Sequence, residues 1–265
     1  MTDSTSLGDR MKAYEHAART VLPRRTYTVV RVDGRSFSRF LRHADKPFDD
    51  VVMAAMDAVA ETLCADMSGA VLAYTQSDEC SVLLTDFAAP GTQPWFGGVV
   101  QKVASVAAST ASIAFNRTYS VGYDDAHATF DGRVFTVPTA VEAANYFVWR
   151  QRDAVRNSIA MAAQAHFSHR QLHRANTVRM RGLLLEKGVD WDDYPGGCKR
   201  GRVTVRCTGE RDVTFTHRRT GEEITGRATR SWWETAAAPH FTAAAGGWLA
   251  EAIPPLPALT EGIAP

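Results

Sequence analysis

Three acidic residues stand where strand-like segments end. Asp33 closes a β-branched and aromatic run, residues 26–32, and is followed by Gly34. Asp78 and Glu79 lie in a polar link between two short apolar runs. Taken alone, Asp33 is explained better by turn chemistry than by metal binding, because Asp and Gly both favour turns. Two carboxylates held together instead indicate a bound divalent cation or a shared proton.

Two segments after Asp33 indicate a helix and then a hairpin. Pro47 fits the first turn of a helix, and Asp49 and Asp50 suit its positive end. Apolar residues then recur at helical spacing until about residues 68–69. Residues 71–74 and 80–84 read as two short strands joined by the polar link.

A second helix and a further strand complete the pattern. Apolar or small residues fall on one face of the expected helix, namely Val99, Val103, Val106, Thr110 and Ile113. Residues 127–138 are strand-like, either as one strand or as a tight hairpin at Asp131-Gly132, because Asp-Gly is a strong turn signal.

The order strand, helix, strand, strand, helix, strand is typical of an α+β, ferredoxin-like fold. In that fold the first and third strands are antiparallel neighbours, so Asp33 and Asp78 should meet at one edge of the sheet. This expectation favours a metal site over two unrelated turns. Gly34 would let a backbone carbonyl approach the same ion.

The bulk composition is that of an ordinary globular protein of 265 residues. No apolar run approaches the roughly 18 residues that span a bilayer, and the N-terminal segment lacks a basic region followed by an apolar one. We therefore expect a cytoplasmic protein without a membrane segment. The four cysteines form no CxxC pair, which favours reduced thiols over zinc or disulfides.

Charge is distributed unevenly along the chain. Residues 150–230 contain 17 Lys or Arg and 9 Asp or Glu, a balance of +8, so the remainder of this +1 chain carries −7. A basic carboxyl half beside an acidic amino half suits a polyanion-binding surface next to a cation site. A solvated surface without a partner is the alternative.

Five motifs occur together in one order: RVDGRSFSRF, KPFDD, YTQSDECSVLL, FDGRVF and YFVWRQRDAVRNS. In this respect the chain resembles the tRNA-His guanylyltransferase family over about residues 26–158. The resemblance implies a catalytic domain similar to the palm of polymerases, at residues 1–140, and a basic region for tRNA binding and oligomerisation at residues 141–265. It also implies 3′-to-5′ addition of nucleotides to tRNA, ATP and GTP as substrates, two Mg²⁺ ions and a homotetramer.

The resemblance also implies roles for individual residues. Asp33 and Asp78 match the carboxylates that bind both magnesium ions, with the Gly34 carbonyl as a further ligand, and Glu79 matches the acidic residue that supports the catalytic pair. The expected nucleotide-binding residues are Ser36, Phe37, Lys46, Asp49, Ser77 and the triphosphate-binding Lys102. The expected tRNA or phosphate contacts are Arg133, Arg150, Arg152, Arg156, Asn157, Arg170, Arg174, Lys199 and Arg200.

Two departures indicate which branch of the family the chain resembles. Eukaryotic members carry a His-Ile-Asn-Asn block where this chain has Val155, Arg156, Asn157 and Ser158, and Ser38 replaces a histidine. The block is tied to adding the extra guanosine of tRNA-His. The sequence instead resembles the bacterial guanylyltransferase-like branch, whose members extend 5′-truncated tRNAs by copying the opposite strand.

Other readings of the same residues remain open. A nucleotide cyclase of the diguanylate type would also set carboxylates on a ferredoxin-like sheet, and a non-catalytic RNA-binding module would explain the basic half. His166, His169 and His173 share one helical stretch, but a basic surface is favoured over a metal site because no carboxylate accompanies them.

Trp232 and Trp233 suit a core or interface anchor better than base stacking. The Pro-rich tail from residue 253 suggests an extended arm.

Overall fold

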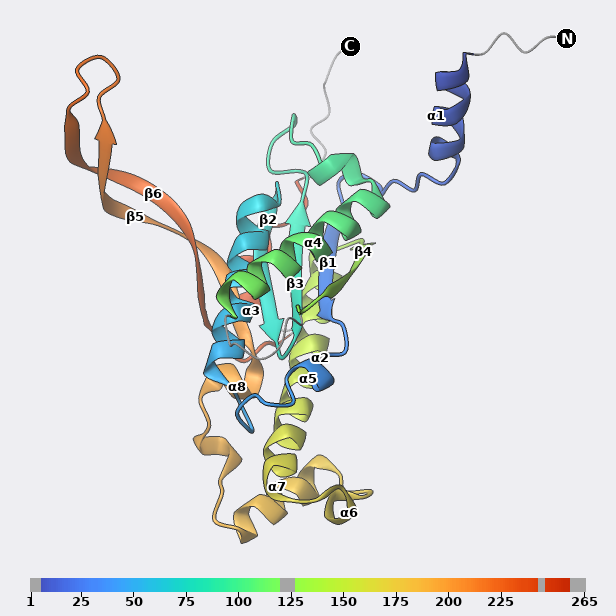
Figure 1. The fold of residues 1–265 in the computed structure, drawn as a ribbon, viewed down its shortest axis with the longest axis vertical. Helices are drawn as coiled ribbons and strands as arrows, with labels where there is room; N and C mark the ends of the chain where they lie inside the picture. The colour runs from blue at the N-terminus through green and yellow to red at the C-terminus, as the bar shows by residue number, and fades with distance from the viewer. Residues whose placement is uncertain (1–5, 120–126, 243–245, 258–265) are drawn as a thin grey trace, which may run out of the picture.

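The computed structural model describes residues 6–119, 127–242 and 246–257. Its centre is a six-stranded antiparallel sheet in the order β4-β1-β3-β2-β5-β6 (Figure 1). The strands are β1 (Tyr27–Gly34), β2 (Ala70–Gln76), β3 (Glu79–Thr85), β4 (Phe130–Val137), β5 (Arg202–Thr216) and β6 (Glu223–Ala237). The first four strands have the ferredoxin-like order, so the predicted α+β class is confirmed.

Helices cover both faces of this sheet. On one face, α3 (Asp50–Asp66) and α4 (Val100–Thr118) pack over the alternate side chains Val30 and Val32 of β1. On the other face, α5 (Ala140–His166) packs over Tyr27 and Val29. Both faces of the strands are therefore buried, which places the acidic end of β1 in a rigid frame.

The predicted helices are present, but two details of the prediction were wrong. Pro47 lies before α3 rather than in its first turn, because the Asp49 carboxylate accepts a bond from the Val52 N–H and so sets the first helical residue at Asp50. In α4, Ile113 is 59% exposed. The buried face contains mostly small residues, namely Val103, Ala107, Ala111, Ala114 and Phe115.

The Asp131-Gly132 pair lies inside one continuous strand and not in a hairpin. β4 pairs with β1 over its whole length, from Phe130 opposite Gly34 to Val137 opposite Tyr27. A Cβ on Gly132 would lie 2.4 Å from the main-chain oxygen of Ala104 in α4. The glycine is therefore required by close packing between helix and strand.

The chain after residue 140 shares the sheet and the core with the chain before it. β5 pairs with β2, and Phe147 of α5 packs in one cluster with Leu72 and Leu83 of the first part. The functional division near residue 140 stays a prediction, but it does not separate two cores.

The end of α5 carries a smaller helical unit. This unit consists of α6 (His169–Leu172), α7 (Thr177–Glu186), η2 (Trp191–Asp193) and α8 (Gly196–Arg200). Ile159 and Ala162 of α5 pack there against Leu184 and Trp191. No helix in the described ranges is long and apolar enough to span a bilayer.

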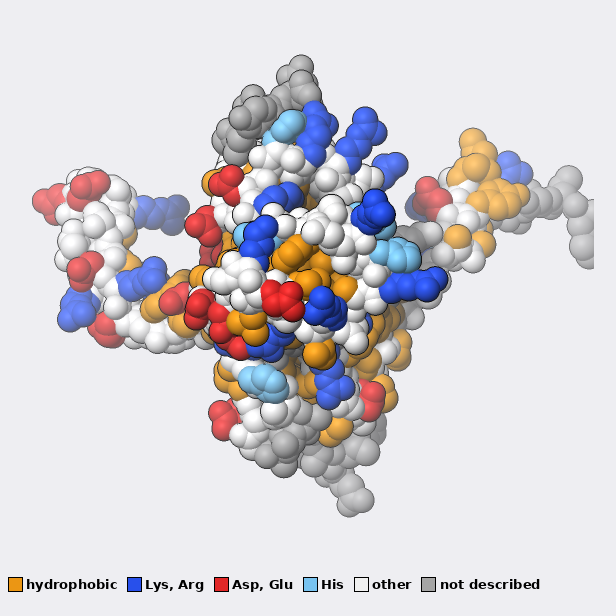
Figure 2. Space-filling view, turned by 90° about the horizontal axis from the view of Figure 1, so that it is seen from below, with side chains coloured by type: hydrophobic (Ala, Val, Ile, Leu, Met, Phe, Trp, Pro, Cys, Tyr) orange, Lys and Arg blue, Asp and Glu red, His pale blue; other side chains and the backbone are white. Residues whose placement is uncertain are grey.

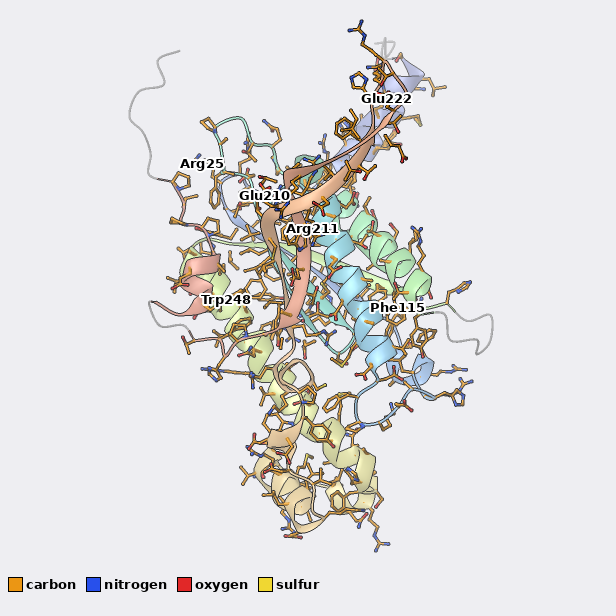
Figure 3. All side chains as sticks on the ribbon, turned by 90° about the vertical axis from the view of Figure 1, so that its left-hand side faces the viewer. Arg25, Phe115, Glu210, Arg211, Glu222 and Trp248 are labelled. Carbon is orange, nitrogen blue, oxygen red and sulfur yellow. The ribbon has the colours of Figure 1, made fainter. Side chains whose placement is uncertain are left out.

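Two elements project from the body. α1 (Leu7–Ala17) contains no buried residue, and β5 and β6 continue beyond the sheet as a twisted two-stranded arm (Figures 1 and 3). Glu222 lies near the tip of this arm in Figure 3. Trp233 packs partly against the core, whereas the Trp232 ring lies 3.6 Å from the Arg211 guanidinium.

The remaining helical elements are short. η1 (Trp95–Gly98) precedes α4, α2 (Phe37–Phe40) follows β1, and α9 (Trp248–Ala252) precedes the Pro-rich tail. The Pro254 carbonyl accepts a 2.8 Å bond from the Tyr27 hydroxyl, which holds the start of the tail on the body. The part of the predicted extended arm from residue 258 lies outside the described residues.

Candidate active site

The fold brings the acidic residues together at one end of the sheet. Asp33 lies directly opposite Glu79 in the pairing of β1 with β3, and Asp78 precedes Glu79 in the turn that joins β2 to β3. The Gly34 N–H donates a 3.0 Å hydrogen bond to the Asp78 carbonyl. Main-chain pairing thus fixes both segments that carry the carboxylates.

The electrostatics of this pair suit a divalent cation. Burial raises the pKa of the Asp78 carboxyl, and the nearby charge of Asp33 raises it further. Magnesium is commonly held by one or two carboxylates together with substrate phosphates. Within the described residues, no three His, Cys, Asp or Glu side chains form a metal cage. The two carboxylates of Asp33 and Asp78 are a donor set of the kind that magnesium uses together with substrate.

Position 34 requires glycine for a packing reason that the sequence prediction missed. A Cβ at this position would lie 2.3 Å from the Phe37 ring, so glycine leaves room for that ring beside the strand end. Phe37 is 3% exposed and packs against Phe115 and Phe130. Its side chain is part of the core, which leaves only its main chain near the site.

Arg150 is buried, whereas its predicted contact with tRNA needs an exposed side chain. Its Nε and Nη2 donate bonds of 2.7 and 2.5 Å to the two carboxylate oxygens of Glu79, and the side chain is 7% exposed. Burial raises the pKa of the Glu79 carboxyl, and the Arg150 guanidinium opposes that shift. Glu79 is therefore bound within the fold.

A cleft opens beside the Ser77-Asp78 turn. Three of the predicted nucleotide-binding residues, Lys46, Asp49 and Ser77, line it. Asn157, predicted as a tRNA contact, lines the opposite side from α5. Further lining residues that sequence reasoning did not select are Phe48, Gln76, Met161 and Cys198. Of these four, only Phe48 and Gln76 could have been selected from the sequence, because they lie within the KPFDD and YTQSDECSVLL motifs.

Asp49 serves the helix as well as the cleft. Its two carboxylate oxygens accept bonds of 2.9 Å from the Val52 N–H and 2.8 Å from the Asp45 N–H. Its proposed contact with nucleotide must therefore share oxygens that already cap α3.

The remaining nucleotide predictions are placed elsewhere. Ser36 is exposed and precedes α2 in a left-handed conformation, with φ of 57°. Lys102 lies in the first turn of α4, with its Nζ 4.6 Å from the centre of the Phe96 ring. Their nucleotide contacts stay predictions.

The predicted phosphate contacts spread over α5 and the helical unit at its end. Arg152, Arg156, Arg170 and Arg174 are exposed, although Arg156 pairs with Asp153. Figure 2, which views this end of the molecule, shows several Lys, Arg and His side chains mixed with acidic ones.

Of the other predicted phosphate contacts, Lys199 and Arg133 have partners nearby, whereas Arg200 is partly buried. The Lys199 amine donates to the Asp192 carbonyl, and Arg133 lies 3.5 Å from Asp131. Arg200 is only partly exposed, and its Nε is buried without a hydrogen-bond partner. Their contacts with tRNA stay predictions.

Sequence reasoning missed Arg31. This side chain is 13% exposed, and its Nη1 lies 3.8 Å from Glu79. The signal was available, because side chains two residues apart in a strand share a face, which places Arg31 on the same face as Asp33.

We expect Asp78→Asn to stabilise the metal-free protein. The fold raises the pKa of Asp78, so ionisation destabilises the folded state as the pH rises from the pKa of free aspartate, about 4, through the folded value. At pH 7 with EDTA, the free energy of unfolding in urea should increase by roughly 0.5–2 kcal/mol. This gain should shrink as the pH falls toward about 4.

The control for this prediction is Asp131→Asn, which removes an exposed carboxylate that lies directly opposite Asp33 on β4 and pairs with Arg133. It should leave the unfolding midpoint almost unchanged in EDTA. Added Mg²⁺ should stabilise the wild type but not Asp78→Asn, because only a folded state that binds the ion is favoured by it. Equal stability of wild type and Asp78→Asn at pH 7 would contradict the argument.

Comparison with known proteins agrees with this geometry. The family described as tRNAHis guanylyltransferase matches residues 8–138. A bacterial tRNA-His guanylyltransferase-like protein in complex with ATP is 40% identical, with a TM-score of 0.77, over 89% of this chain and 94% of that chain. The corresponding complex with GTP is 36% identical, with a TM-score of 0.69, over 89% and 93%.

A curated relative is more distant but carries the family's activity in its name. The tRNA(His) guanylyltransferase of Debaryomyces hansenii is 26% identical, over 76% of this chain and 79% of its own length. Together with the bacterial structures, these matches place the chain among nucleotidyltransferases. The chain belongs to the tRNA-His guanylyltransferase family.

Proposed function

We propose that this protein adds nucleotides in the 3′-to-5′ direction to the 5′ end of tRNA and repairs truncated tRNAs by copying the opposite strand. The observation that carries the proposal is the Asp33–Asp78 pair beside a cleft that Lys46, Asp49 and Ser77 line. The bacterial relatives bound to ATP and GTP support nucleotides as substrates. The block Val155-Arg156-Asn157-Ser158 supports the repair branch, because it departs from the eukaryotic pattern.

The chemistry has two stages. In the first, an oxygen of the tRNA 5′-monophosphate attacks the α-phosphorus of ATP and releases pyrophosphate, which leaves an adenylylated 5′ end. In the second, the 3′-hydroxyl of an incoming nucleotide attacks the 5′ phosphate and releases AMP. Both stages depend on positioning and on neutralising phosphate charge, as phosphoryl transfer generally does.

We propose that Asp33, Asp78 and the Gly34 carbonyl hold two magnesium ions. When bound, these ions would supply activation of the attacking oxygen and neutralisation of phosphate charge. Lys46 and Ser77 would orient the nucleotide in the cleft, with Asp49 contributing from the start of α3. The exposed arginines of α5 and α6 would hold the tRNA backbone, because a guanidinium forms forked bonds with phosphate.

The decisive experiment supplies tRNA that lacks its first 5′ nucleotide, with each of the four bases placed in turn opposite the gap. Labelled nucleotides, ATP and Mg²⁺ are added, and the product is resolved by length. We expect incorporation to follow the opposing base, and EDTA should abolish it. Addition of guanosine whatever the opposing base would contradict templated repair.

The two rival functions give different results in simple assays. A diguanylate-type cyclase would convert GTP alone to a cyclic product without tRNA. A non-catalytic RNA-binding module would bind tRNA but incorporate nothing and show no Mg²⁺ binding by titration. The family supports neither rival.

We further expect a homotetramer that acts in the cytoplasm.

A further inference from the structure

The buried ion pair between Glu79 and Arg150 lies next to the proposed metal site. The two side chains are each 7% exposed, and Arg150 uses a forked pair of bonds of 2.7 and 2.5 Å. Each oxygen of Glu79 thereby accepts a bond from Arg150. Glu79 is therefore held as an anchor.

Arg150 is itself held from two further sides. Asp153, one turn along α5, accepts a 3.0 Å bond from Arg150 Nη2, and the Trp149 ring centre lies 4.4 Å from the guanidinium carbon. Asp153 also pairs with Arg156. A guanidinium constrained in this way has little freedom to move, so it fixes the position of Glu79.

The position of Glu79 sets the position of Asp78. Asp78 and Ser77 form the turn immediately before Glu79, and Ser77 has an unusual φ of 48°. The ion pair ties this turn to α5, while the Gly34–Asp78 hydrogen bond ties it to β1. Two anchors on different elements thus hold Asp78 beside Asp33.

Arg150 also limits the repulsion within the site. Asp33, Asp78 and Glu79 place three carboxylates at one end of the sheet. Arg31 contributes a more distant charge, 3.8 Å from Glu79. Without Arg150, an unpaired Glu79 would repel its neighbours and move the turn.

We propose that Arg150 is a positioning residue that acts through Glu79 to hold Asp33 and Asp78 in the arrangement that binds a divalent cation. This role replaces the predicted contact between Arg150 and tRNA phosphate. It rests on the proposed metal site, so the test measures metal binding directly as well as tRNA binding.

The test titrates Mn²⁺ into wild type, Arg150→Met and Arg150→Lys, and follows free Mn²⁺ by electron paramagnetic resonance. We expect Arg150→Met to bind Mn²⁺ about 10- to 100-fold more weakly, as residues that support metal ligands usually do. Arg150→Lys should restore part of the affinity, because lysine keeps the charge but not the forked geometry. Wild-type affinity in Arg150→Met would overturn the proposal.

Arg152 provides a matched control, because it is an exposed arginine on the same helix. Arg152→Met should leave the Mn²⁺ affinity unchanged and reduce the salt dependence of tRNA binding by about one unit of slope. Arg150→Met should leave that slope unchanged. A lower slope together with normal Mn²⁺ binding in Arg150→Met would restore the phosphate-contact role and reject ours.

A second variant covers the possibility that Arg150→Met fails to fold. Glu79→Gln/Arg150→Met removes both charges of the pair, so that neither is left buried without the other. It should fold more readily than Arg150→Met, because neither member of the pair is left charged and the glutamine amide can still accept a bond from Arg31. It should still bind Mn²⁺ more weakly than wild type. Unchanged affinity in the folded double variant would overturn the proposal. Absence of Mn²⁺ binding in the wild type would instead reject the proposed metal site.

Discussion

Replacing Asp33 or Asp78 with alanine should abolish nucleotide addition while tRNA binding stays close to that of the wild type. Asp33 lies at the end of β1, and Asp78 lies beside it in the β2–β3 turn. Among the ion pairs of the described residues, the nearby Arg31 pairs with Glu79 and not with these two carboxylates. Removing one of them costs several kcal/mol of transition-state stabilisation, or on the order of a thousandfold in rate. Single-turnover incorporation into truncated tRNA measures the loss.

The same variants separate chemistry from binding. The exposed arginines that we expect to contact tRNA lie on α5 and α6, whereas the mutated carboxylates lie on β1 and in the β2–β3 turn. The dissociation constant for tRNA should therefore change less than about threefold. The mutated carboxylates act on the tRNA phosphates only through charge, and salt screens that effect. Asp131→Asn removes an exposed carboxylate on the neighbouring strand and should keep most of the activity. Full activity in Asp33→Ala or Asp78→Ala would reject the assignment.

The meeting of Asp33 and Asp78 could be predicted because it follows from topology. Once the order of strands and helices is read, the ferredoxin-like arrangement makes β1 and β3 antiparallel neighbours. The carboxylates then fall at the same end without any knowledge of side-chain packing. Sequence periodicity is enough for this step, because it needs only element order and strand ends.

The partners of individual charged residues could not be predicted in the same way. Arg150 was assigned to a basic surface because it lies in a run rich in arginine, yet it is buried against Glu79, 71 residues earlier in the chain. Its neighbour Arg152 is exposed. Which of two arginines faces the sheet depends on the rotation of α5, and the sequence sets that rotation only through the sum of many packing contacts.

The face of α4 was misassigned for a related reason. The predicted Val103 is buried and Val106 packs against the core, but Ile113 is exposed and the rest of the buried face consists of three alanines and Phe115. Small residues allow a helix to approach a strand closely, and hydrophobic periodicity gives them too little weight. The close approach also decides the role of Gly132, which sequence alone left between a strand and a hairpin.

Gly132→Ala should destabilise the protein by about 3 kcal/mol, measured by urea unfolding. The new Cβ would lie 2.4 Å from the Ala104 oxygen and 3.1 Å from its carbonyl carbon. Both are main-chain atoms of α4, so no side-chain rotation can relieve the overlap. The helix must move away from β4, which loosens its buried alanine face and exposes apolar surface.

Gly226→Ala is the matched control, because Gly226 also lies within a strand, β6, but nothing lies within 4 Å of its added Cβ. Its backbone is free of positive φ, so alanine should be neutral or slightly stabilising through reduced freedom of the unfolded chain. Equal unfolding midpoints for the two variants would show that α4 can shift at little cost. A large loss in Gly132→Ala alone would establish that direct contact between α4 and β4 holds the strand next to Asp33 in place.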